Sequence, residues 1–139
     1  MTKKKSNQIT LRDKVTLDGV GLHTGKNVRL TFRPAPVDTG YVFIRTDLKP
    51  IVEIPADIIY VTNTDRGTNL EKDGAKIQTS EHVLAALVGM SIDNCFIELD
   101  SAESPIMDGS SKFFVEAIES VGIREQDKLR EEFIVTDLI

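Results

Sequence analysis

Hydrophobic and polar residues alternate along the first half of the chain, and this pattern indicates β-strands. Over residues 28–33, Val28, Leu30 and Phe32 alternate with polar side chains, so one face of this strand is apolar. A second alternating run covers residues 42–44, after a turn sequence. The first half of the chain is therefore predicted to form a sheet with one buried face.

Shorter strand patterns predict a small β insert over about residues 51–78. The runs Ile51–Ile54 and Ile58–Val61 are apolar and are interpreted as strands. Asp73 and Gly74 follow between two further short runs. Because both residues can adopt positive φ, they predict a type I′ hairpin turn.

Two helices are predicted in the second half of the chain, over about residues 80–90 and 111–121. Each carries an apolar stripe at helical spacing, formed by Val83, Leu84, Leu87 and Val88 in the first and by Phe114, Val115, Ile118 and Val121 in the second. Thr79 or Ser80 can cap the start of the first helix, and Ser110 that of the second.

The order of these elements predicts an α+β fold. Strands come first, and a compact strand over residues 94–99 separates the two helices. We expect a two-layer sandwich, ribosomal S5 domain 2-like, with both helices on one face of a mainly antiparallel or mixed sheet, in a domain over residues 1–123. Residues 124–139 are interpreted as a charged linker and, from Phe133, the first strand of a missing second domain. The alternative is a terminal strand that folds back onto the sheet.

Composition and charge narrow the possible functions. The 139 residues carry a net charge of -5, which disfavours a nucleic-acid partner because phosphate binding needs a clustered basic surface. Cys95 is the single cysteine, so this chain can form neither an internal disulfide nor a cysteine-based zinc site. We expect no integral membrane segment, since no apolar run approaches the roughly 18 residues of a membrane span. The first 14 residues lack the apolar region of a secretory signal, so we expect a cytoplasmic protein.

Glu81 and His82 are the first candidates for chemistry. Both fall in the first turn of a predicted helix, where the local potential favours an ionised carboxylate and a neutral imidazole. A neutral imidazole binds zinc, and a carboxylate can act as a general base. For the dipeptide taken by itself, an ordinary helix start, in which the dipole favours Glu81, is the better explanation. The metalloprotease motif with two histidines on one helix is absent.

Three other motifs contain candidate binding residues. The glycine-rich segment Gly19–Gly25 can approach a ligand closely, and His23 within it could donate to a phosphate, a sugar or an acyl carbonyl. A turn joining two strands explains the same glycines. The segments Asp65–Thr68 and Pro105–Ser110 are the other two motifs, and for the second a turn leading into a helix is sufficient.

The ordered set of motifs is more specific than any single member. It spans residues 17–123 and comprises, in order, Gly19–Lys26, Arg33–Pro36, Arg45–Leu48, Thr79–Leu87, Ile92–Asn94 and Pro105–Ser110. This set resembles the N-terminal domain of the UDP-3-O-acyl-N-acetylglucosamine deacetylase (LpxC) family of lipid A biosynthesis. The segments 65–68 and 110–118 resemble most closely the Bacteroidetes branch, in which the deacetylase is often fused to a FabZ-type dehydratase, a lyase.

The resemblance implies a zinc-dependent amidohydrolase that removes the N-acetyl group from UDP-3-O-(3-hydroxyacyl)-N-acetylglucosamine, with an active site between two similar domains. His82 matches the first of three zinc ligands, and Glu81 matches the general base. The other two ligands belong to a His-x-x-x-Asp motif of the second domain. The positions that border the substrate in the family match Leu22, His23, Asp65, Arg66, Gly67 and Thr68.

The resemblance also implies that this chain holds an incomplete site. His23 and His82 are its only histidines, whereas a catalytic zinc usually has three protein ligands. We therefore expect the chain alone to be inactive and to bind zinc weakly or not at all. Its expected partners are a UDP-sugar lipid substrate and the second domain, with self-association possible through the surface that otherwise meets that domain. A non-catalytic α+β binding module is the competing hypothesis.

Overall fold

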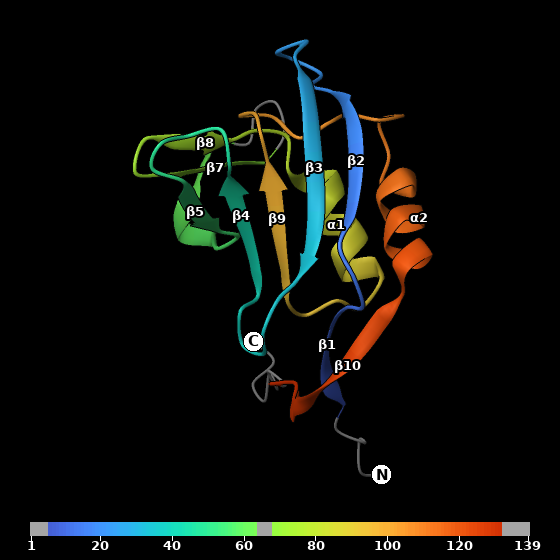
Figure 1. Cartoon of the computed structure of the whole chain (residues 1–139). Coiled ribbons are helices and arrows are strands. Elements are labelled where there is room, and N and C mark those ends of the chain that lie inside the picture. The colour runs from blue at the N-terminus through green and yellow to red at the C-terminus, as the bar shows by residue number, and fades with distance from the viewer. Residues whose placement is uncertain (1–5, 64–67, 132–139) are drawn as a thin grey trace, which may run out of the picture.

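The main sheet contains five strands in a computed structural model that describes residues 6–63 and 68–131. The order across the sheet is β2-β3-β9-β4-β5 (Figure 1). Strand β4 runs parallel to β9, and the other neighbouring strands are antiparallel. The bounds of the strands are Val15–Val20 for β2, Asn27–Pro34 for β3, Tyr41–Arg45 for β4, Val52–Pro55 for β5 and Cys95–Leu99 for β9.

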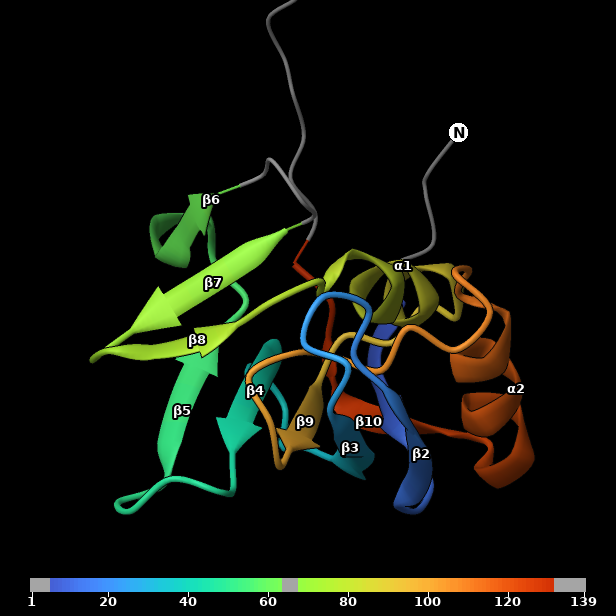
Figure 2. The same cartoon turned by 90° about the horizontal axis from the view of Figure 1, so that it is seen from above.

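Helices α1 (Glu81–Gly89) and α2 (Lys112–Val121) lie on one face of this sheet (Figure 2). The predicted two-layer α+β arrangement is therefore confirmed. The layers meet at Phe32 and Phe114, both fully buried, whose rings pack edge to face with centroids 6.2 Å apart. Among the described residues, no helix combines the length and apolarity needed to cross a membrane.

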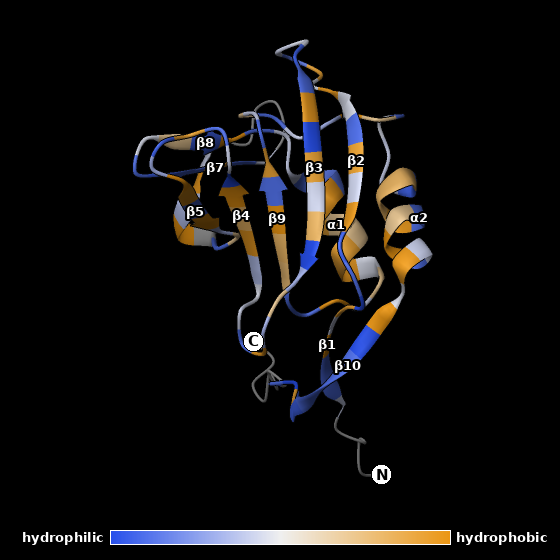
Figure 3. Ribbon diagram, viewed as in Figure 1, coloured by the Kyte–Doolittle hydropathy of each residue, from blue (hydrophilic) through white to orange (hydrophobic). Residues whose placement is uncertain are grey.

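The alternation along β3 assigns its side chains to two environments. Val28, Leu30 and Phe32 are buried beneath the helices, as the sequence predicts. Arg33 faces the other way and forms an ion pair with Glu98 of β9 across 3.1 Å. Figure 3 shows the resulting alternation of hydrophobic and hydrophilic positions along the strand.

A second, three-stranded sheet lies beyond the β5 edge of the main sheet (Figures 1 and 2). It contains β6 (Val61–Asn63), β7 (Asn69–Lys72) and β8 (Ala75–Ile77). Asp73 and Gly74 have φ of 52° and 79°, which confirms the predicted turn between β7 and β8.

Two details of the predicted insert are wrong. Strand β5, assigned from sequence to the insert, pairs with β4 in the main sheet. Residues Ile58–Tyr60 form a short 3₁₀ helix, η1, instead of a strand. The reason is Asp57: its carbonyl accepts the Tyr60 N–H at 3.0 Å and its carboxylate accepts the Ile59 N–H at 3.2 Å, which closes a turn.

The interpretation of residues 124–129 as a linker is also wrong. Residues Ile123–Leu129 form β10, which pairs antiparallel with β1 (Asn7–Leu11) in a ribbon beyond one end of the main sheet (Figure 1). Because both faces of β10 are largely exposed, the strand can carry charged side chains while its backbone supplies the pairing. Arg130 then binds the Asp93 carboxylate through two nitrogens, at 2.8 and 2.9 Å. The strand predicted from Phe133 lies outside the described residues.

The helix starts are only partly as predicted. The N-cap of α2 is Ser111, which forms no side-chain cap, and not the predicted Ser110; the Ser110 hydroxyl accepts the Lys112 N–H at 3.2 Å from one residue further back. Neither predicted cap of α1 is formed, because the Ser80 hydroxyl donates to the Thr68 carbonyl and the Thr79 hydroxyl donates to Glu103. The side chains before α1 therefore connect the helix to other segments.

Candidate active site

Glu81 and His82 open the first turn of α1, as the sequence predicts. Oε1 of Glu81 lies 3.8 Å from Nε2 of His82. The two side chains are 35% and 33% exposed, so solvent or a ligand can reach both. An acceptor and an imidazole therefore lie side by side at the positive end of a helix, where a carboxylate is stabilised.

Thr68 contacts the same turn through its backbone. Its N–H donates to Oε2 of Glu81 across 3.0 Å. Its carbonyl accepts the Ser80 N–H at 3.0 Å and the Ser80 hydroxyl at 2.8 Å. Thr68 thus directly contacts Glu81, the candidate base. Asp65, Arg66 and Gly67 lie outside the described residues.

Leu22 and His23 lie in the exposed loop between β2 and β3. The loop is closed by backbone hydrogen bonds from the Gly25 N–H to the Gly21 carbonyl and from the Gly21 N–H to the Lys26 carbonyl. Leu22 is 58% exposed, which is high for so apolar a side chain. The loop geometry therefore leaves Leu22 accessible to a ligand.

Glu103 connects this loop to the start of α1. Its carboxylate accepts the His23 N–H at 3.0 Å and the Thr24 N–H at 2.9 Å. On its other side it accepts the Thr79 hydroxyl at 2.8 Å. Glu103 is fully buried; burial opposes its ionisation, but the hydrogen bonds from Thr24, Thr79 and His23 together hold its pKa below the ordinary value.

Glu103 is a site residue that the sequence does not predict. It lies in a polar stretch a few residues after the exposed Asp100, and no spacing or periodicity distinguishes the two carboxylates. Gly21 and Pro105, which belong to two of the sequence motifs, pair in an isolated β-bridge next to it, so only the fold brings these motifs together at Glu103.

Comparison with known proteins shows the family of the chain. The family model described as LpxC, UDP-3-O-acyl N-acetylglycosamine deacetylase, matches residues 8–139. The chain belongs to the LpxC family.

Individual LpxC relatives are similar over most of the chain. The chain is 54% identical over 136 residues to a UDP-3-O-acyl-N-acetylglucosamine deacetylase of Hahella chejuensis, covering 94% of the chain and 45% of the relative. It is 56% identical over 121 residues to the deacetylase of Xanthomonas oryzae pv. oryzae, covering 87% and 40%. It is 49% identical over 132 residues to the Bifunctional enzyme LpxC/FabZ of Chlorobaculum tepidum, covering 95% and 28%. The chain thus spans less than half the length of these relatives.

The described residues do not by themselves supply a full ligand set for the zinc that the LpxC resemblance implies. Within residues 6–63 and 68–131, no group of three or more His, Cys, Asp or Glu side chains could hold a metal. Cys95 contributes nothing, since it is fully buried in the sheet and burial raises the pKa of its thiol to about 12. His82, partly exposed at the start of α1, has the donor chemistry of one zinc ligand.

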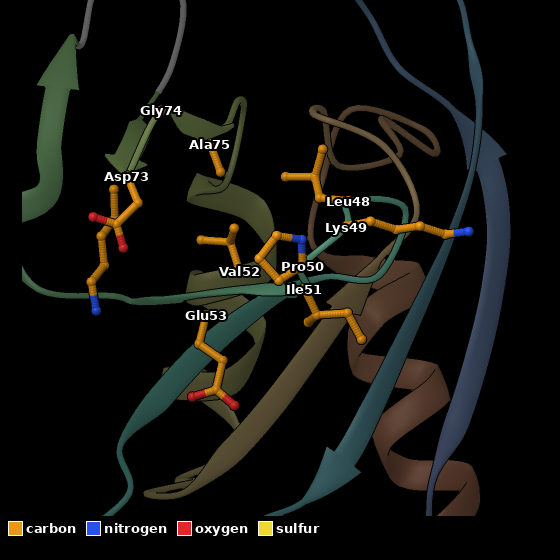
Figure 4. A pocket seen from close by; sticks show the side chains of 10 residues that line it. Leu48, Lys49, Pro50, Ile51, Val52, Glu53, Asp73, Gly74 and Ala75 are labelled. Carbon is orange, nitrogen blue, oxygen red and sulfur yellow. The ribbon is translucent and has the colours of Figure 1, made fainter.

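A separate hollow of about 520 Å³ lies between the loop before β5 and the β7–β8 turn (Figure 4). Its lining includes Leu48, Val52, Glu53 and Gly74. None of the candidate site residues described above lines it. The hollow is at the turn end of β8, whereas α1 follows the other end, and we assign it no part in the LpxC site.

Proposed function

We propose that the protein containing this chain is a zinc-dependent amidohydrolase that removes the N-acetyl group from UDP-3-O-acyl-N-acetylglucosamine in lipid A biosynthesis. The observation that carries the proposal is the Glu81 carboxylate, held by the Thr68 N–H beside His82 in a chain of the LpxC family. Neighbouring residues on a helix point about 100° apart, so each can serve a different partner.

His82 and Glu81 have different roles in this proposal. His82 would supply one imidazole ligand, and the zinc, when bound, would polarise the attacking water and the carbonyl of the N-acetyl group. Glu81 takes the proton from that water, and the same carboxyl group can then protonate the departing amine. The products are acetate and a free amine on the sugar. The hydrogen bond from Thr68 to Oε2 leaves Oε1 available to accept the proton.

The other zinc ligands would come from a second domain of the same protein, consistent with the length of the relatives. We propose that the chain alone is inactive, that Leu22, His23 and Thr68 border the UDP-sugar lipid and that the reaction takes place in the cytoplasm. Self-association of the isolated chain stays a prediction.

Zinc content and acetate release test this proposal in the full-length protein. We expect roughly one zinc per catalytic site and deacetylation that a chelator abolishes and zinc restores. His82→Ala should lose most of the zinc, because one of three ligands is removed. His23→Ala is the matched control, since it removes the other histidine and should leave the zinc in place. Unchanged zinc in His82→Ala would contradict the assignment of His82.

A further inference from the structure

The buried carboxylate of Glu103 stands where two separate parts of the site meet. One part is the β2–β3 loop with Leu22 and His23, and the other is the run through Thr79 into α1. Oε1 of Glu103 accepts the N–H groups of His23 and Thr24, while Oε2 accepts the Thr79 hydroxyl and shares the His23 N–H at 3.1 Å. A single carboxylate thus binds both parts.

The backbone around Glu103 forms the same connection. The Gln78 N–H donates to the Ala102 carbonyl at 2.7 Å, and the Ser104 N–H donates to the Gln78 carbonyl at 3.1 Å. On the other side, the Ile106 N–H donates to the Val20 carbonyl at 2.9 Å. Residues 102–106 therefore connect, through backbone hydrogen bonds, the end of β2 to the segment that precedes α1.

Thr79 gives independent reason to regard this contact as more than packing. Its φ is 58°, in the left-handed region, which is rare for a β-branched residue and costs free energy. Two side chains hold it there: Asn69 accepts its N–H at 3.1 Å, and Glu103 accepts its hydroxyl. This backbone conformation directs the chain into Ser80 and Glu81.

Gly21 shows how closely the loop approaches the carboxylate. A Cβ at this position would lie 2.4 Å from Oε1 of Glu103. Since Oε1 is fixed by two N–H donors in a buried site, it has little freedom to move away. The glycine is thus required for the loop to reach Glu103.

We propose that Glu103 is a positioning residue, whose buried carboxylate fixes the substrate-bordering loop at His23 and Thr24 relative to the helix start that presents Glu81 and His82. Glu103 itself stays away from the reacting atoms. It acts through the loop on substrate binding and through Thr79 on the placement of the base. This inference rests on the proposed deacetylase function for its kinetic consequence, although the physical link is independent of it.

Steady-state kinetics of the full-length protein separate the two actions. Glu103→Gln keeps the size of the side chain and removes its charge; it should lower kcat and raise KM, so that kcat/KM falls about tenfold or more. Thr79→Val replaces only the hydroxyl with a methyl group, so it should lower kcat and leave KM within about twofold. Glu119→Gln on the exposed face of α2 is the matched control and should change neither. A Glu103→Gln enzyme whose kcat falls only with its folded fraction, at unchanged KM, would overturn the proposal.

Hydrogen exchange at the amides of His23 and Thr24 gives a readout that needs no activity. Both amides should exchange faster in Glu103→Gln than in the wild type and in Glu119→Gln. If the wild type fails to deacetylate while these amides lose protection, the proposed function fails and the link at Glu103 stands. If the protection is unchanged, the link itself is wrong, whatever the activity.

Discussion

The backbone N–H of Thr68 donates a 3.0 Å hydrogen bond to Oε2 of Glu81, so a residue outside helix α1 fixes the carboxylate that opens it. The Thr68 carbonyl in turn accepts the Ser80 hydroxyl and the Ser80 N–H. Because both polar groups of one peptide segment are used, the end of the small sheet and the start of α1 hold each other in place. The candidate base is thus oriented by backbone, which leaves the Thr68 side chain for another role.

Replacing Ser80 tests this connection. Ser80→Ala removes a buried hydroxyl and its 2.8 Å hydrogen bond to the Thr68 carbonyl, and should lower the free energy of unfolding by about 1 kcal/mol. Thr68→Ala keeps every backbone contact to Ser80 and Glu81, so it should cost less. Urea unfolding of both variants measures the difference. A Ser80→Ala variant as stable as the wild type would show that the hydroxyl contact contributes nothing.

A pair of glycine substitutions tests the close approach at the loop. Gly21→Ala places a Cβ 2.4 Å from Oε1 of Glu103 and should destabilise the protein by about 1–3 kcal/mol, since the buried carboxylate must move. Gly89→Ala adds the same methyl group at the end of α1, where a Cβ would meet nothing within 4 Å, and should be neutral or stabilise by about 0.5 kcal/mol. Thermal unfolding of the two variants should therefore shift in opposite directions or differ clearly in size. A harmless Gly21→Ala would contradict the contact.

The raised pKa of Tyr41 predicts that the folded state loses stability at alkaline pH. Burial, followed by the negative charge of Asp93, raises its pKa from 10.0 to about 12, and its hydroxyl donates to the Ile92 carbonyl. The folded state therefore favours the neutral phenol, and this contribution is complete below pH 10 and disappears as the pH rises from 10 to 12. In a Tyr60→Phe background, the tyrosinate absorbance should titrate with a midpoint near 12 in the folded protein. A midpoint near 10 would mean that the phenol is not sequestered.

The elements with periodic apolar residues could be predicted from the sequence. Val28, Leu30 and Phe32 identified β3 because only one of its faces is buried. Strand β10 could not be found in this way, since its side chains are exposed on both faces and its pairing with β1 depends on backbone groups alone. Local polar contacts decided the rest: Asp57 turns residues 58–60 into a 3₁₀ helix despite their β propensity.

The site residues also differ in whether local sequence or only a long-range contact identifies them. Glu81 and His82 are adjacent in sequence, so the helix pattern and the family motifs together were enough to select them. Glu103 follows Glu81 by more than 20 positions and contacts a loop about 80 positions before it. No pattern along the chain reports such a contact, and it required the fold.

The most direct test of the proposed deacetylase function is the turnover of the full-length protein with Glu81→Gln. The amide oxygen can still accept the Thr68 N–H, so the fold of the helix start and the zinc content should be preserved while the base is lost. We predict that kcat falls by about 10²–10⁴-fold with zinc unchanged, whereas Glu119→Gln turns over like the wild type. Near wild-type turnover of Glu81→Gln with full zinc would contradict the assignment of Glu81 as the general base.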